Sequence, residues 1–483
     1  MILSAMTYEF FGSTWMYWGF TIAYAVTILS IVGVVLSENR NPLKSLAWIT
    51  VLILFPAVGI VLYVFFGRSI KNQRMISRRN KRRLLKDDNY IKGTGNLKLE
   101  NANQRNLATI ARSLNGSVYF SDNDVELFFA GKEKFESMVK DLKSAENYIH
   151  IQYYIFENDK IGSQIAEILI ERARRGVKVR VIYDHIGSIH VKNRFFKEMS
   201  EAGIEVYPFF RVAFPPFATR MNWRNHRKIV VIDGKTGYIG GMNIADRYID
   251  GGAKFSSWRD THVRLTGPAV AALQYSFAVD WNFMGQPLIT ESAGGKSECN
   301  QNVGLQLITS GPTSQWSNVA MVFLRAISSA TKRIYIQTPY FLPTESLLKA
   351  LQAAALSHVD VRIMIPKRSD SVVLTNASFS YISECLKAGI KIYLYEKGMM
   401  HAKTMIIDDN WSTIGSTNFD FRSFEHNFEA NLLIYSSEIN SRMATQFSED
   451  MTECSRVRPA LWHKRPIIQK AKESIVRLLS PIL

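Results

Sequence analysis

The chain has 483 residues, of which 47% are hydrophobic, and its formal net charge at pH 7 is +17. This length allows roughly three units of ordinary domain size with a large buried core. The three cysteines, Cys299, Cys385 and Cys454, form no CxxC pair, which argues against a zinc site or a disulfide framework and agrees with a reducing compartment. The positive charge points to an anionic partner, either nucleic acid or an anionic membrane surface.

Two apolar stretches stand near the N-terminus. Residues 15–36 and 46–66 contain no charged residue, and each is long enough to cross a hydrocarbon core of about 30 Å as a helix. Aromatic residues near their ends favour membrane spans over buried core helices, and the chain lacks the basic start of a cleaved signal peptide. We therefore predict that residues 1–66 form a membrane anchor with two transmembrane helices. Pro56 and Gly59 interrupt the second stretch and leave a re-entrant hairpin as the alternative.

Basic residues predict the orientation of this anchor. The link between the two stretches has only Arg40 and Lys44, whereas the run after residue 66 is strongly basic and contains no acid. The positive-inside rule therefore puts both ends and the large C-terminal body in the cytoplasm. A basic run can be merely solvated, but beside a membrane it also suits contact with anionic lipids. The run lies in a predicted juxtamembrane linker, residues 67–115, and consists of Arg68, Lys71, Arg74, Arg78, Arg79, Lys81, Arg82 and Arg83.

From about residue 116 the chain alternates short apolar runs with amphipathic helices, which is typical of an α/β body. Residues 148–156 and 177–183 are predicted strands with a helix over 161–174 between them, a parallel crossover unit. The same order returns later, in residues 333–337, 344–356 and 359–365, and residues 202–207 are echoed by 388–393. We predict two duplicated α/β/α halves related by a pseudo-twofold axis. Their predicted ranges are 116–300 and 301–455, followed by a basic amphipathic tail, 456–483.

One motif occurs once in each predicted half. Residues 226–233 read His-Arg-Lys-Ile-Val-Val-Ile-Asp, and residues 401–408 read His-Ala-Lys-Thr-Met-Ile-Ile-Asp. If each is a strand from its histidine onward, the histidine and the lysine project from the same face. Two such pairs suit a phosphodiester: one imidazole attacks phosphorus, the other protonates the leaving alkoxide, and the lysines offset negative charge. The predicted catalytic set is His226, Lys228, Asp233, His401, Lys403 and Asp408.

Within this set the two aspartates have a different predicted role. Asp233 and Asp408 stand at an odd spacing from their histidines, and Asp233 precedes a glycine. We expect both to support a hairpin turn rather than to carry protons.

Further site residues follow each motif. The small-residue bends 240–243 and 415–418 end in Asn243 and Asn418, which are predicted to contact the substrate phosphate. Asp260 and Glu429 are the predicted acceptors that orient the two imidazoles. No metal and no cofactor are expected, because each motif interleaves a cationic lysine and no HExxH appears.

A loop rich in proline and aromatic residues, 208–217, precedes the first motif. It is either a plain surface loop or one whose Phe210, Phe214 and Phe217 touch the bilayer or line an acyl-chain channel.

The duplicated HxKxxxxD motif resembles that of the phospholipase D superfamily. Within that superfamily the paired apolar stretches with Asn39-Arg40-Asn41-Pro42 between them, and the tail from Arg465-Pro466 to Pro481, are similar to bacterial cardiolipin synthases. The resemblance covers nearly the whole chain. It implies a multi-pass protein of the bacterial cytoplasmic membrane that needs no metal and binds phosphatidylglycerol and anionic lipids, but no nucleic acid.

The reaction that the resemblance implies is phosphatidyl transfer between two phosphatidylglycerol molecules, which gives cardiolipin and glycerol through a phosphohistidine. By similarity His226 is the nucleophile and His401 the general acid and then base. The nearly symmetric halves leave these two roles exchangeable. Two alternative functions would use the same site. One is a phospholipase D that forms phosphatidic acid, and the other is a phosphodiesterase or nuclease of the same superfamily.

Overall fold

The computed structural model describes residues 14–37, 42–63, 70–71, 73–86, 99, 101–211, 222–289, 291 and 299–478. The chain divides into two compact units. One comprises Met1–Ser69 and Val212–Asn222, and the other comprises Ile70–Arg211 and Trp223–Leu483.

The N-terminal unit is helical where it is described. Its helices are α2 (Thr14–Ser37), α3 (Pro42–Leu54) and α4 (Pro56–Leu62). The helix breaks at Phe55, whose φ of −132° and ψ of 67° are not helical, because the residue before a proline is pushed away from the helical region. The predicted interruption at Pro56 is thus confirmed.

Among the residues that the structure describes, no helix combines the length and the hydropathy that a membrane crossing requires. The two predicted spans stay a prediction.

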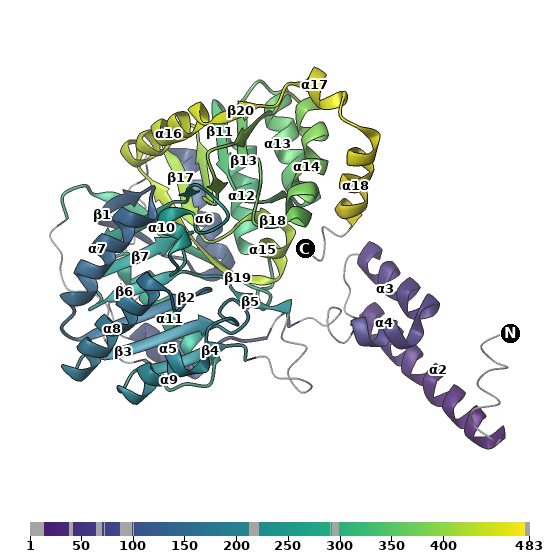
Figure 1. Ribbon diagram of the computed structural model, residues 1–483, viewed down its shortest axis with the longest axis horizontal. Coiled ribbons are helices and arrows are strands. Elements are labelled where there is room, and N and C mark those ends of the chain that lie inside the picture. The colour runs from purple at the N-terminus through teal and green to yellow at the C-terminus, as the bar shows by residue number, and fades with distance from the viewer. Residues whose placement is uncertain are drawn as a thin grey trace. The chain divides into compact units, whose positions relative to one another are not determined.

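The second unit is built on one sheet of sixteen strands (Figure 1). Two pairs of short strands, β12 with β18 and β8 with β15, form separate ladders. The strands are β1 (Tyr119–Phe128), β2 (Tyr148–Tyr153), β3 (Lys178–Asp184), β4 (Glu205–Phe209), β5 (Arg224–Asn225), β6 (Ile229–Ile232), β7 (Thr236–Gly240), β8 (Trp258–Arg259), β9 (His262–Thr266), β10 (Val303–Ser310), β11 (Arg333–Gln337), β12 (Phe341–Leu342), β13 (Asp360–Pro366), β14 (Lys391–Tyr395), β15 (Met399–Met400), β16 (Thr404–Ile407), β17 (Trp411–Gly415), β18 (Phe419–Asp420), β19 (Asn427–Tyr435) and β20 (Cys454–Arg456).

The strand order reads alike from both edges of this sheet. From one edge inward it is β4, β3, β2, β6, β7, β9 and β1. From the other edge, after β20, it is β14, β13, β11, β16, β17, β19 and β10. The central pair β1 and β10 is antiparallel, and the predicted crossover units appear as the parallel pairs β2 with β3 and β11 with β13. This order supports the predicted internal repeat.

Helices cover both faces of the sheet. On one face α7, α8 and α9 pack on the first half while α6, α12, α13 and α14 pack on the second; on the other face α11 and α16 share one core with both halves. The helices are α5 (Arg78–Lys86), α6 (Ala102–Asn115), α7 (Gly131–Lys143), α8 (Lys160–Arg174), α9 (Asn193–Glu201), α10 (Arg247–Asp250), α11 (Val270–Phe283), α12 (Asn318–Ser328), α13 (Glu345–Leu356), α14 (Val372–Lys387), α15 (Phe421–Glu425), α16 (Ser437–Thr452), α17 (Pro459–His463) and α18 (Ile467–Leu478). The helices predicted over 161–174 and 344–356 agree with α8 and α13 to within one residue.

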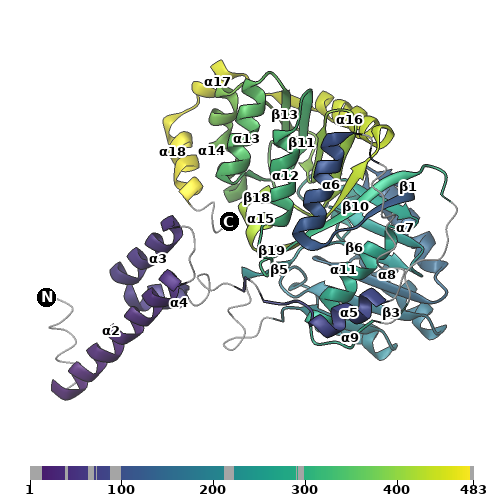
Figure 2. The ribbon, with the colours of Figure 1, turned by 180° about the vertical axis from the view of Figure 1, so that it is seen from behind.

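Part of the predicted linker belongs to this body. Leu107 and Ala111 of α6 are buried in the core of the second half with Phe323 of α12, and Figure 2 shows the two helices side by side. Leu84 of the basic helix α5 is buried in a cluster with Phe277 and Trp281 of α11, which belongs to the first half. Apolar residues inside a polar segment thus fix both helices to the body.

The aromatic loop is described only up to Arg211. Phe209 is fully buried, and the ring of Phe210 packs on Phe283 and Phe428 with centroid distances of 5.6 and 5.8 Å. Phe210 is thus partly buried and belongs to an aromatic cluster of the body, and its contact with lipid stays a prediction. Phe214 and Phe217 lie outside the described residues.

Candidate active site

Each motif histidine lies in a short link between two strands. His226 stands between β5 and β6, and His401 between β15 and β16. The backbone N–H of His226 donates to the carbonyl of Phe428 at 2.9 Å, and that of His401 to the carbonyl of Arg259 at 2.7 Å. The prediction that each strand begins at its histidine is wrong, because these backbone groups bond to the opposite half and the strands begin only after the lysines.

The two orienting carboxylates cross between the halves. Nδ1 of His226 lies 3.0 Å from Oε1 of Glu429, and Nδ1 of His401 lies 2.6 Å from Oδ2 of Asp260. Each acid is fully buried. Glu429 directly follows Phe428, whose carbonyl accepts from the backbone of His226, and Asp260 directly follows Arg259, whose carbonyl accepts from the backbone of His401. Each half therefore supplies the acid for the other half's imidazole, and Nε2 of each ring is left as its reactive nitrogen.

The small-residue bends make room for these carboxylates. A Cβ at Gly241 would lie 2.1 Å from Oδ1 of Asp260. At the matching place in the second half, the hydroxyl of Ser416 donates to Glu429. The bends therefore hold the orienting acids. In the first half Gly241 lies against Asp260, and in the second half Ser416 lies against Glu429.

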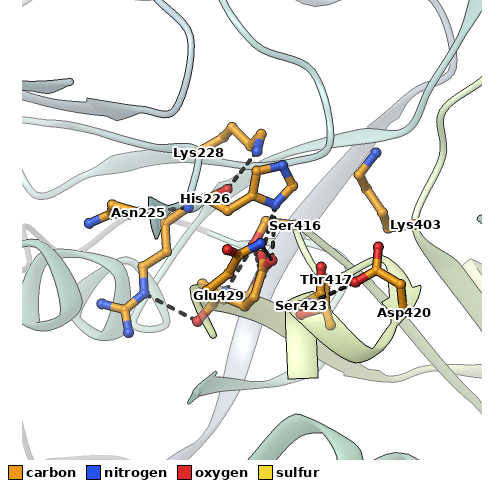
Figure 3. A network of polar contacts seen from close by, with 12 residues as sticks. Asn225, His226, Lys228, Lys403, Ser416, Thr417, Asp420, Ser423 and Glu429 are labelled. Atoms are coloured by element: carbon orange, nitrogen blue, oxygen red, sulfur yellow. Dashed lines mark hydrogen bonds and ion pairs between the residues drawn. The ribbon is translucent and has the colours of Figure 1, made fainter. Parts of the chain in front are cut away.

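Both motif lysines are buried beside the histidines. Nζ of Lys228 donates to the carbonyl of His226 at 2.6 Å, and Nζ of Lys403 donates to the carbonyl of His401. Nζ of Lys403 also lies 2.8 Å from Nδ1 of His401, but that nitrogen can carry only one hydrogen and donates it to Asp260. Figure 3 shows Lys228 and Lys403 on either side of His226, with Glu429 directed at its ring.

The motif aspartates lie away from the histidines. The carboxylate of Asp233 accepts the backbone N–H groups of Glu146, Asn147 and Tyr148 at 2.7–2.8 Å, and Asp408 binds the start of β11 in the same way. Asp233 and Asp408 have φ values of 51° and 49°, as expected where a hairpin turns. These contacts fit the supporting role that we predicted for both aspartates.

The two asparagines differ in their contacts. Asn243 is committed to the protein: its Oδ1 accepts from Ile155 N–H at 3.1 Å, and its Nδ2 donates to Tyr248. Oδ1 of Asn418 is buried and accepts no hydrogen bond from any residue that the structure describes. A phosphate oxygen accepts hydrogen bonds, so a phosphate contact by Asn418 would come from its Nδ2 rather than from Oδ1. The same amide group also bonds to Asp420.

One cavity of about 740 Å³ joins the two motifs. His226 and His401 line it together with Asn243, Asn418 and Asp420, while the lysines and the orienting acids lie buried behind the imidazoles. Tyr154 meets the ring of His226 edge-on at 5.0 Å, and Trp258 lies 5.1 Å from that of His401. The aromatic walls keep both imidazoles from rotating freely.

Burial sets the protonation of this site. It lowers the pKa of His401 to about 4, with Lys403 acting in the same direction against Asp260. It also lowers the pKa of His226, although Glu429 opposes the shift. Burial raises the pKa of Asp420 to about 6. A lowered pKa favours the neutral form of the His226 imidazole, which is the form that can attack phosphorus.

A buried layer behind the histidines was missed from the sequence. Asp280 of α11 accepts from Arg227 at 2.6 Å and from Gln152 at 2.5 Å. In the second half Asp450 of α16 accepts from Gln337 at 2.6 Å and pairs with Arg259 at 2.8 Å. The signal was visible in the repeat, where Gln152 and Gln337 occupy the same place in two matching buried strands.

A mixed α/β body whose two histidine–lysine motifs meet in one cavity defines a phospholipase D-like protein. A family model described as "Cardiolipin synthase, PLD-like domain" matches residues 138–280 and 323–451, one segment in each half. A second, described as "Phospholipase_D-nuclease N-terminal", matches residues 22–68. The chain belongs to the cardiolipin synthase family.

Similar proteins agree with this membership. The major cardiolipin synthase of Bacillus subtilis (strain 168) is 39% identical over 478 residues, which cover 96% of this chain and 98% of that protein. A cardiolipin synthase of Listeria monocytogenes serotype 4a (strain HCC23) is 36% identical over 486 residues, covering 96% and 99%. The crystal structure of phosphatidylserine synthase from Haemophilus influenzae Rd KW20 shares the fold, with a TM-score of 0.60 and 13% identity over 79% of this chain and all of that one.

Proposed function

We propose that this protein makes cardiolipin by transferring a phosphatidyl group from one phosphatidylglycerol molecule to another. The observation that carries the proposal is the crossed arrangement in one cavity, in which each imidazole is oriented by a buried carboxylate of the opposite half. This arrangement leaves two Nε2 atoms for two roles in displacement at phosphorus.

In the first step, Nε2 of His226 attacks the phosphorus of the donor lipid. A P–N bond forms and the P–O bond to glycerol breaks. His401 enters this step as an imidazolium that has taken up a second proton on Nε2 beside the anionic phosphate, and it gives that proton to the departing glycerol oxygen. In the second step the terminal hydroxyl of the acceptor lipid attacks the same phosphorus, and its proton passes to His401. The P–N bond breaks, His226 is regenerated, and cardiolipin is released.

The remaining site residues have supporting roles in this proposal. Lys228 and Lys403 stabilise the negative charge on the non-bridging oxygens, Asn418 contacts the phosphate, and Asp260 and Glu429 keep the imidazoles in the required tautomer. Asn243 acts indirectly, through its contact with Ile155.

The proposal places the enzyme in the bacterial cytoplasmic membrane, with residues 1–66 as the anchor and the catalytic body on the cytoplasmic side. What supports this is the apolar, largely exposed surface of the N-terminal helices, where Trp15, Ile22 and Leu29 are 89%, 60% and 69% exposed. Such side chains suit lipid better than water. The substrate suits the same location, since both of its copies stay in a bilayer.

The test gives the purified full-length protein phosphatidylglycerol as its sole lipid. Cardiolipin and glycerol in equal amounts are the expected products, and His226→Ala and His401→Ala should each lower their formation by at least about a thousandfold. Phosphatidic acid in place of cardiolipin would indicate hydrolysis. Cleavage of DNA without any lipid product would make the protein a nuclease and refute the proposal.

A further inference from the structure

The proposed reaction requires two phosphodiesters in one cavity. When the acceptor lipid enters, the first phosphorus is already bound to His226, and the acceptor brings a second negative charge to within a glycerol unit of it. Two like charges so close repel strongly in a partly buried site. Since Lys228 and Lys403 serve the first phosphate, the second needs a cation of its own.

One wall of the cavity carries two arginines beside His226. Arg224 lies in β5, two residues before His226, and Arg422 lies in α15 of the other half; both line the cavity. The short parallel ladder between β5 and β19 brings these segments together, with Arg224 opposite Asn427. Arg224 and Arg422 both act electrostatically on Tyr154, whose ring touches the imidazole of His226. The two guanidinium groups are therefore near the reacting nitrogen.

Two acids, Asp184 and Asp420, act on this pair. Asp184 pairs with Arg224 at 3.3 Å, but the same carboxylate also accepts the backbone N–H groups of Asn225, Ile186 and Gly187. Burial, with Arg224 as a further cause, lowers the pKa of Arg422, while Asp420 and Asp184 only partly oppose this. A bound anion would relieve that unfavourable environment.

Another part of the cavity lining, around Arg247, contains more acidic than basic side chains. Arg247 is paired with Glu157 at 2.8 Å, and Asp159 and Asp246 line the same side of the cavity. Their carboxylates hold the start of α8 by accepting backbone N–H groups there. This part of the lining thus holds the three carboxylates of Glu157, Asp159 and Asp246 against the two cations of Arg247 and Lys254.

We propose that Arg422, supported by Arg224, forms the subsite for the phosphate of the acceptor lipid. A guanidinium presents paired N–H donors that match two oxygens of a phosphodiester. This contact is made only when the acceptor itself carries a phosphate. Water or free glycerol cannot use it, so the subsite favours lipid-to-lipid transfer over hydrolysis and over exchange of the headgroup. The inference rests on the proposed function.

Two reactions of the same full-length enzyme separate this role from general damage. Cardiolipin formation from phosphatidylglycerol uses both subsites, whereas exchange of labelled glycerol into phosphatidylglycerol uses the histidines and only one phosphate. In Arg422→Gln the ratio of cardiolipin formation to exchange should fall by about ten- to a hundredfold, the usual effect of losing a hydrogen bond to a charged group. Arg422→Lys keeps the positive charge but loses the paired N–H donors of the guanidinium. Its ratio of cardiolipin formation to exchange should lie between those of the wild type and of Arg422→Gln.

Arg247→Gln is the matched control, because it removes an arginine from another part of the lining of the same cavity. Its ratio should stay within about threefold of the wild-type ratio. Equal losses of both reactions in Arg422→Gln, or an equal change of ratio in the two variants, would overturn the inference. A wild-type enzyme that exchanges glycerol but forms no cardiolipin would instead refute the proposed function.

Discussion

The site holds its two lysines where their charge is costly. Burial lowers the pKa of Lys403 to about 8, although Asp260 and Glu429 oppose the shift, and burial lowers the pKa of Lys228 well below its ordinary value. Negative charge that develops on a phosphoryl group between the two lysines stabilises their cationic forms. Because this gain grows as charge accumulates on the oxygens, it favours the transition state over the bound substrate.

This electrostatics predicts the pH dependence of the first step. A phosphatidyl ester of p-nitrophenol isolates that step, since its leaving group is a stable anion that needs no acid. Its kcat/KM requires neutral His226 and cationic lysines. The acid limb should lie below 6.5, because the pKa of His226 is lowered, and the basic limb no higher than about 8, where Lys403 loses its proton.

The measurement is the initial rate of nitrophenol release between pH 4 and 10, corrected for spontaneous hydrolysis, with kcat/KM as the readout of the free enzyme. A profile that stays level up to about pH 10, as an ordinary lysine would give, would contradict the assigned role of these two side chains.

At the scale of elements, two very short ladders build the site. β5 pairs in parallel with β19, and β8 with β15. In each ladder one strand leads directly into a histidine. The acid that orients this histidine lies in the opposite strand, as Glu429 does in β19, or directly after it, as Asp260 does after β8. Neither half can therefore form a complete histidine–carboxylate pair alone, which explains why the halves share one continuous sheet and one core beneath α11 and α16.

The crossing predicts opposite effects for two isosteric substitutions. Glu429→Gln should slow the burst of nitrophenol from the activated donor by at least about a hundredfold, because His226 loses the acceptor that fixes its tautomer. Asp260→Asn should keep a burst of one equivalent per enzyme but slow later turnover, since His401 is needed only to remove the acceptor's proton. Stopped-flow absorbance measures both phases.

The reverse result, with the burst lost in Asp260→Asn and kept in Glu429→Gln, would make His401 the nucleophile. Equal effects on both phases in both variants would show that the acids serve folding rather than either imidazole. Glu425→Gln in α15 is a control, because that carboxylate accepts a hydrogen bond from Ser317 rather than orienting either motif histidine.

The sequence was enough to predict the repeat, because its strands and helices recur with their own periodic patterns at matching positions. It was also enough to name Asp260 and Glu429, which stand at comparable places after the two motifs. Their crossing was not predictable, since it depends on β5 and β8, which are two residues long and show no periodicity. The core role of α6 was hidden because Leu107 and Ala111 stand in a polar segment.

At the scale of the whole molecule, the last helix of the second unit has an exposed apolar surface that we predict contacts a bilayer. The last helix, α18, turns charged residues toward the protein: Arg477 pairs with Glu384 at 2.5 Å, and the buried Glu473 pairs with Arg465 at 2.6 Å. Its isoleucines face outward, with Ile468 71% and Ile475 64% exposed. An amphipathic helix with this orientation suits the interface of an anionic membrane better than water.

Replacing Ile468 and Ile475 with serine should weaken the binding of the catalytic body to the lipid surface. Moving one isoleucine side chain out of an apolar phase costs about 1.5–3 kcal/mol, so Ile468→Ser/Ile475→Ser should raise the apparent KM for phosphatidylglycerol at least about tenfold at unchanged kcat. Mixed detergent micelles with a varied mole fraction of lipid measure this. Leu356→Ser, which alters an equally exposed apolar residue at the end of α13, should leave KM unchanged. If the double variant behaves like this control, α18 does not touch lipid.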